Sequence, residues 1–145
     1  MFLGEYQRSL DNKGRLFIPS KFRDNLEKNK VVLSKGFDEK CLFIYSALGW
    51  EEIVKKMNSL PLTQTKMQQF SRWIFKSAHE EDVDSQGRIK IDKELIDFAE
   101  LGKDIVLVGV SARAEVWSKK LWEEYSMRAE KEFSGNNKAF EELGF

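Results

Sequence analysis

Hydrophobic and polar residues alternate over short runs in much of this chain, the pattern of half-buried β-strands. Turn residues bound the runs, most clearly at Asp11 and Gly14. An Asp side chain there can accept from the backbone two residues on, and Gly can adopt a positive φ. We therefore expect strands at residues 4–10, 16–18, 31–33, 42–45, 78–83, 87–91, 105–110 and 113–117.

Apolar residues at helical spacing lie between these groups of strands. A short helix is expected at residues 21–26 with Ser20 as its N-cap, and a longer one at 50–57. After a break at residues 60–63, Thr63 is the expected N-cap of a helix over 64–76. Further helices are expected from residue 92, over 119–132 and within 138–143.

The strongest signal is an internal duplication. The segment from Leu10 to Ile18 matches the segment from Val83 to Ile91 at a displacement of 73 positions (84 − 11). Such matches, in order and along most of the chain, indicate two copies of one strand-rich unit.

The match continues past the first hairpin. Leu33 falls over Val106 at the same displacement, and after one extra residue in the first copy Trp50 falls over Trp122. Each copy has only about 45–50 residues, near the lower limit for independent stability. We therefore expect one core shared by both copies, and exposed strand edges that favour a homo-oligomer.

Composition narrows the class of protein. The chain has 145 residues, 41% hydrophobic and 33% charged, which suits one soluble folded unit. No apolar run is long enough for a membrane helix or a signal peptide, so a cytoplasmic location is expected. Cys41 and His79 are the single residues of their types, which excludes a disulfide framework and a multi-cysteine metal site and argues against ordinary histidine-based metal or triad chemistry.

Charge is unevenly distributed although 24 basic and 24 acidic residues give no net charge. Residues 1–35 hold 8 basic and 4 acidic side chains, and residues 76–103 hold 5 basic and 8 acidic ones. The first copy is therefore the basic one. A basic hairpin can enter the DNA major groove, where Arg contacts guanine and Lys contacts phosphates.

The first hairpin offers the best candidates for DNA contact. Arg15 follows the turn directly, and its basic neighbours in the sequence are Lys13, Arg8, Lys21 and Arg23. From composition alone, DNA binding and a solvated basic face are equally favoured. Arg88 holds the matching position in the second copy, but the acidic run 80–82 precedes it, so it is expected to act more as an ion-pair partner.

Other chemistry has little support in the sequence. The run 79–82 (His-Glu-Glu-Asp) lacks distant His or Cys partners and is interpreted as charged surface rather than a metal site. Cys41 lies in an apolar strand and is expected to be buried, and Trp50 and Trp122 are expected in the core. No phosphate-binding loop, dinucleotide fingerprint or nucleophile elbow is present, so no enzyme, cofactor or small-molecule substrate is predicted.

Several stretches together resemble the MraZ family of bacterial transcriptional regulators. They are MFLGEYQRSLDNKGRLFIPSKFR, GFDEKCLFIY, DSQGRIKI and VLVGVSARAEVWSKKLWEEY, and the resemblance runs in order along essentially the whole chain. The family's signature is a duplicated Asp-x-x-x-Arg, here Asp11 to Arg15 and Asp84 to Arg88. Two departures are Asp92 where the family usually has Pro, and one extra residue in the loop at 37–41.

The resemblance implies an α+β, strand-rich fold of two AbrB/SpoVT-like swapped-hairpin units that form a shared small barrel, with helices after each unit. We expect repeats at 5–50 and 77–120, connecting helices at 51–76 and a C-terminal helical segment at 121–145. It also implies a ring-shaped homo-oligomer, associated with the nucleoid, that binds direct repeats in double-stranded DNA upstream of the division and cell-wall gene cluster.

By its motif, the resemblance implies that Arg15 is the leading DNA-binding residue, supported by Lys13, Arg8, Lys21 and Arg23. Arg88 is implied by the same motif, but with less force. Asp11, Gly14, Asp84 and Gly87 are then the structural residues of the two turns. The competing hypothesis is an oligomeric scaffold that keeps the fold without specific DNA binding, which the zero net charge and the acidic second copy favour.

Overall fold

A computed structural model describes residues 1–61 and 63–145. The first copy holds β1 (Phe2–Ser9), β2 (Arg15–Phe17), α1 (Ser20–Arg23), the 3₁₀ turn η1 (Glu27–Asn29), β3 (Lys30–Lys35), β4 (Leu42–Tyr45), α2 (Ala47–Asn58) and α3 (Thr65–Phe75). The second holds β5 (His79–Asp82), β6 (Arg88–Lys90), α4 (Lys93–Phe98), β7 (Asp104–Ser111), β8 (Arg113–Ser118), α5 (Lys119–Phe133) and α6 (Asn137–Glu142). No helix in the described ranges is both long and apolar enough to cross a bilayer.

The two copies exchange strands. A six-stranded antiparallel sheet has the order β1-β7-β8-β4-β3-β5, and β2 pairs with β6 in a separate two-stranded ribbon. The first strand of each copy therefore pairs with the third strand of the other, and the second strands pair with each other. The α+β, strand-rich class and the swapped hairpins of two duplicated units are confirmed. The shared small barrel stays an expectation.

The sequence alignment of the copies is wrong by one residue in the third strand. Leu33 pairs with Ile44 and Leu107 pairs with Val116, so Leu107, not Val106, is the structural counterpart of Leu33. The displacement there is 74 (107 − 33), because the helix and loop between the second and third strands are one residue longer in the second copy. Side chains along a β-strand alternate between its two faces. A one-residue error in the alignment would therefore assign each side chain of this strand to the opposite face.

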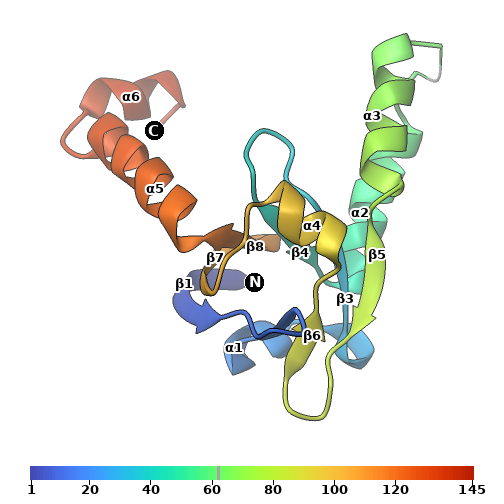
Figure 1. Cartoon of the computed structure of the whole chain (residues 1–145). Helices are drawn as coiled ribbons and strands as arrows, with labels where there is room; N and C mark the ends of the chain where they lie inside the picture. The colour runs from blue at the N-terminus through green and yellow to red at the C-terminus, as the bar shows by residue number, and fades with distance from the viewer. Residues whose placement is uncertain (62) are drawn as a thin grey trace.

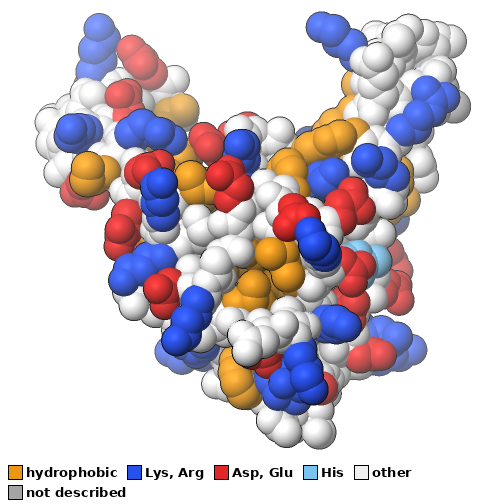
Figure 2. All heavy atoms as spheres, viewed as in Figure 1, with side chains coloured by type: hydrophobic (Ala, Val, Ile, Leu, Met, Phe, Trp, Pro, Cys, Tyr) orange, Lys and Arg blue, Asp and Glu red, His pale blue; other side chains and the backbone are white. Residues whose placement is uncertain are grey.

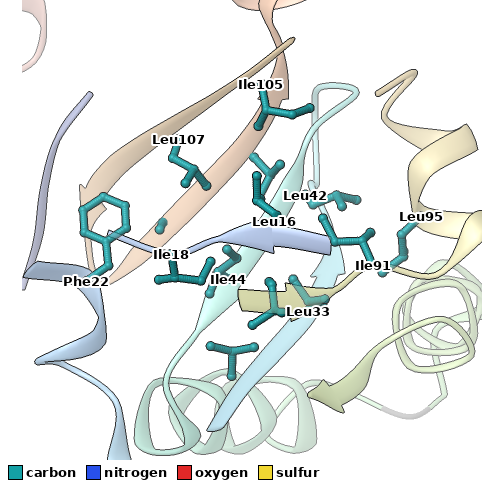
Figure 3. Packing of buried hydrophobic residues seen from close by; sticks show 14 of the residues in the cluster. Leu16, Ile18, Phe22, Leu33, Leu42, Ile44, Ile91, Leu95, Ile105 and Leu107 are labelled. Carbon is teal, nitrogen blue, oxygen red and sulfur yellow. The ribbon is translucent and has the colours of Figure 1, made fainter. Parts of the chain in front are cut away.

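The main core lies between the ribbon and one face of the large sheet. Figure 3 shows Leu16 and Ile18 of the first copy in one cluster with Ile91 of the second copy and with Leu33, Leu42, Ile44 and Leu107 of the sheet. These side chains are almost fully buried. Because both copies supply the core, neither unit buries it alone.

The opposite face of the sheet carries a second apolar cluster. Val32, Phe43, Tyr45 and Trp117 point there because side chains alternate along each strand. Trp50 and Trp122, expected in the core, are half-buried and pack against this cluster from α2 and α5. Figure 1 shows α2–α3 and α5–α6 as two helical arms that diverge from the sheet.

Helix starts differ from the sequence prediction. Ser20 is the first residue of α1 rather than its N-cap, which is Pro19, and the helix ends at Arg23. Thr63 is not the N-cap of α3, which is Gln64, and the adjacent Leu62 lies outside the described residues. The helix predicted from Trp50 starts at Ala47.

A hydroxyl cap explains the earlier start of α2. The Ser46 hydroxyl accepts from the Gly49 N–H over 3.1 Å, and Ser118 caps α5 in the same way through the Leu121 N–H. The two serines occupy matching positions at the ends of β4 and β8, so a serine N-cap starts the long helix of each copy.

Candidate nucleic-acid interface

The two Asp-x-x-x-Arg turns have the same hydrogen bonds. Asp11 Oδ1 accepts from the Lys13 and Arg15 backbone N–H groups, both over 2.9 Å, and its Oδ2 accepts from Arg15 Nε over 2.7 Å. Asp84 repeats this with the Gln86 and Arg88 N–H groups and with Arg88 Nε, each over 2.9 Å. One carboxylate thus closes the turn and fixes the direction of the arginine that follows.

These bonds depend on ionised carboxylates. The backbone N–H of Arg15, followed by its guanidinium, holds the pKa of Asp11 below the ordinary value of 3.8. The N–H and guanidinium of Arg88 lower the pKa of Asp84 in the same way. Hydrogen bonds to the charged form favour it, so both ion pairs are intact at neutral pH.

Glycine is required in both turns. Gly14 has φ +76°, and an added Cβ would lie 2.8 Å from the Ile91 carbonyl oxygen. Gly87 has φ +82°, and there a Cβ would lie 3.1 Å from the Arg23 guanidinium. Each turn is therefore packed against a segment of the other copy: Ile91 covers the first and Arg23 covers the second.

The ribbon of β2 and β6 brings both motif arginines to one face. Arg15 pairs with Lys90, and Phe17 pairs with Arg88, so these four side chains share a side of the ribbon. The intervening pair, Leu16 and Ile89, points into the core and is buried. We call Arg15, Phe17, Arg88 and Lys90 the ribbon face.

The ribbon face is basic and contains an exposed aromatic ring. The Arg15 and Arg88 side chains are 33% and 17% exposed, so the first is more accessible than the second. Phe17 is 48% exposed, and the Arg88 guanidinium lies 5.8 Å from its ring centroid. On the face shown in Figure 2, basic side chains gather over the lower part of the molecule, where β6 and α1 lie in Figure 1.

The other basic residues predicted to contact DNA lie outside the ribbon face, on the first turn, on α1 and on β1. Lys13 is exposed in the first turn and Lys21 is exposed on α1. Arg23, also on α1, lies against Gly87, and its Nε is buried without a hydrogen-bond partner among the described residues. Arg8 lies on β1 opposite Ile105 of the large sheet, and its Nη1 donates to the Gln7 carbonyl over 2.8 Å.

Sequence reasoning missed Lys90 and Phe17. Phe17 lies two residues after Arg15, and Lys90 lies two residues after Arg88. Because side chains two positions apart on a strand share a face, strand alternation would have placed both with the motif arginines. The acids at 80–82 belong to β5 in the other sheet, where Asp82 pairs with Lys30 over 3.4 Å.

The single cysteine of the chain is buried in its thiol form. Cys41 is 1% exposed, and burial raises the pKa of its thiol well above the ordinary range. Burial likewise raises the pKa of nearby Tyr45 to about 12. A cavity of about 440 Å³ beside the loop at 36–40 is lined by Trp73, Phe98 and Trp117 and by charged residues, among them Lys40, Glu124 and Arg128.

The fold and the ribbon face define an interleaved pair of short hairpins with a basic two-stranded ribbon, an element of the kind that the DNA major groove admits. Both halves match the family described as "MraZ protein, putative antitoxin-like", at residues 1–73 and 74–143. The chain belongs to this family, as its motifs predicted, and the family units repeat at the 73-residue displacement of the duplication.

Relatives extend the same finding. The chain is 50% identical over 126 residues to "Transcriptional regulator MraZ" of Acetivibrio thermocellus, covering 87% of each chain. It is 45% identical over 133 residues to the protein of that name from Caldanaerobacter subterraneus, covering 92% of each. These relatives are named as regulators, not as enzymes.

Proposed function

We propose that the chain is a self-assembling, sequence-specific DNA-binding transcriptional regulator, and that the ribbon face is its DNA contact. The observation that carries the proposal is the convergence of Arg15, Arg88 and Lys90 on one side of a two-stranded ribbon. A two-stranded β-ribbon fits the DNA major groove. The names of the relatives support the same function.

The motif arginines are the proposed base-reading residues. Each is held through Nε by its own aspartate, which orients the guanidinium. A guanidinium fixed in this way loses little side-chain entropy on binding, and its paired N–H groups match O6 and N7 of guanine. The proposed role of Lys90 is a phosphate contact or a second base contact beside Arg15.

The first copy is proposed to contact DNA more heavily than the second. Arg15 is the more exposed arginine of the two. Its turn carries Lys13 where the second turn carries Gln86, so the first turn offers one more cation to the phosphates. Lys21 and Arg8 are proposed to add phosphate contacts from the flanks, and Arg23 to support the second turn.

Self-assembly would explain how a chain with no net charge binds DNA. A ring would repeat the same basic ribbon, so that several subunits contact successive direct repeats and weak single contacts add as avidity. Exposed apolar side chains on the two helical arms, such as Phe75, Met127 and Phe133, support association of copies. With the direct repeats upstream of the division and cell-wall cluster as its site, the proposed effect is repression, including of its own operon, and the proposed location is the nucleoid.

A fluorescence-anisotropy titration tests the proposal. The probe is the DNA upstream of the protein's own operon, compared with a scrambled duplex at two salt concentrations. Arg15→Ala should abolish preference for the native DNA while the oligomer size stays unchanged. Arg72→Ala, which removes the same charge from α3, is the matched control and should bind like wild type.

The competing proposal is a scaffold without specific DNA binding. It predicts that a folded wild-type oligomer shows no preference for native over scrambled DNA even at low salt. That result would overturn the regulator and leave partner binding through the helical arms as the function.

A further inference from the structure

Three potential metal ligands from two separate elements meet at the base of the second hairpin. His79 and Glu81 project from the same side of β5, and Asp92 immediately precedes α4. From their geometry we propose that they bind a divalent transition-metal ion, for which Zn²⁺ is the best match. Imidazole with two carboxylates suits such an ion better than Mg²⁺ or Ca²⁺.

The spacing of the donor atoms fits tetrahedral coordination. His79 Nε2 lies 3.4 Å from a Glu81 carboxylate oxygen and 3.6 Å from one of Asp92. The ligand atoms of all three residues lie within 4.8 Å of one another. Zinc bonds of about 2.0–2.1 Å place neighbouring tetrahedral ligands roughly 3.3 Å apart, so small side-chain movements would complete three corners. The fourth corner would be left for water.

The histidine ring is oriented for metal binding. Its Nδ1 lies 3.2 Å from the Ser77 carbonyl oxygen, which can only accept, so Nδ1 carries a proton. The other nitrogen, Nε2, is shielded from solvent and has no hydrogen-bond partner among the described residues. A ring held by a backbone carbonyl, with its second nitrogen aimed at carboxylates, is the usual outer-shell arrangement of a zinc-bound histidine.

The orientation of Asp92 independently supports a metal site. It occupies the N-cap of α4, where Asp normally accepts from the helix N–H groups, yet its side chain makes no capping hydrogen bond. The carboxylate faces His79 instead. Glu94, on α4 itself, is paired with Lys35 over 3.5 Å.

The first copy shows that the fold does not require this cluster. At the 73-residue displacement, the counterparts of the three residues are Tyr6, Arg8 and Pro19, none of which forms such a site. The cluster is therefore a feature of the second copy alone. A bound ion would tie β5 to the chain just after β6 and so close the base of the hairpin that carries Arg88. Figure 2 shows the histidine among acidic side chains at the edge of the molecule.

Zinc competition against a chromophoric chelator, with the full chain at constant neutral pH, tests the proposal. Wild type should bind one Zn²⁺ per chain. Glu81→Gln and Asp92→Asn should each weaken binding at least about 10–100-fold, the cost of losing even an outer-shell partner of a metal site. Glu80→Gln is the matched control, because Glu80 is exposed on the other side of β5, and it should bind like wild type.

Two further readouts separate the site from a simple His–carboxylate ion pair. Co²⁺ should give the intense visible bands of tetrahedral coordination with wild type and Glu80→Gln. Zn²⁺ should raise the melting temperature of those two proteins but not of Asp92→Asn, because a ligand that binds only the folded state stabilises it. Equal Zn²⁺ affinity in all four proteins, or no binding by wild type, would overturn the proposal.

Discussion

The backbone N–H of Ile18 donates to the carbonyl oxygen of Gly87 over 2.9 Å, which joins the end of the first ribbon strand to the turn of the second copy. The reciprocal bond runs from the Ile91 N–H to the Gly14 carbonyl over 2.8 Å. The glycines are therefore tied to the other copy as well as to their own turns. Because of this exchange, damage to one turn should be felt by both halves of the ribbon.

Lys90→Ala is expected to weaken DNA binding without disturbing the fold. Lys90 is exposed on the ribbon face and has no ion pair in the part of the chain that the structure describes. Its removal should lower affinity and reduce the slope of log K against log salt by about 1 per contact. Anisotropy at several salt concentrations measures this, with Lys138→Ala on α6 as the control. An unchanged salt slope would remove Lys90 from the proposed interface.

Gly14→Ala is expected to destabilise the protein more than Gly87→Ala. Both positions have positive φ, which costs a residue with a side chain about 1–3 kcal/mol. At Gly14 the new methyl would also meet a backbone oxygen, whereas at Gly87 it meets a flexible arginine side chain. Urea unfolding should rank the two variants in that order. Gly102→Ala, in open space, is the control and should have the smallest effect.

Asp11→Asn should flatten the loss of stability in acid. The pKa of Asp11 is lower in the folded protein than its ordinary value of 3.8, so the carboxylate stabilises the fold fully above that value. This contribution is lost as the pH falls through the folded-state pKa. The variant should be less stable at pH 7, with a smaller decline below about pH 4. Thermal unfolding across that range tests it, and parallel curves for the two proteins would contradict the assignment.

Cys41 is expected to be nearly inert in the folded protein. Burial raises the pKa of its thiol, and Gly36 packs so closely that an added Cβ would lie 2.7 Å from the sulfur. Because the thiolate is the reactive form, a disulfide reagent at pH 8 should modify the native protein at least about 100-fold more slowly than the urea-unfolded chain. Rapid native modification would show that the loop at 36–41 opens, and Gly36→Ala should then accelerate it.

The sequence by itself determined the duplication, the class of fold and the family. Asp11 and Gly14 recur as Asp84 and Gly87, because a tight turn has few chemical solutions, and alternating apolar residues fix which strands exist. The same local rules identified most strands and the two long helices. They failed at Ser20 and Thr63, where a residue suited to capping does not occupy the cap position.

Only the tertiary structure decided which strands pair with one another. Pairing of Arg15 with Lys90 and of Phe17 with Arg88 is set by the exchange of hairpins between copies, which no local pattern contains. The same exchange separates the acids at 80–82 from the ribbon. Asp92 reaches His79 for a similar reason, since the chain turns back between them. Local chemistry selects the elements, while the requirement to bury one shared apolar core selects their partners.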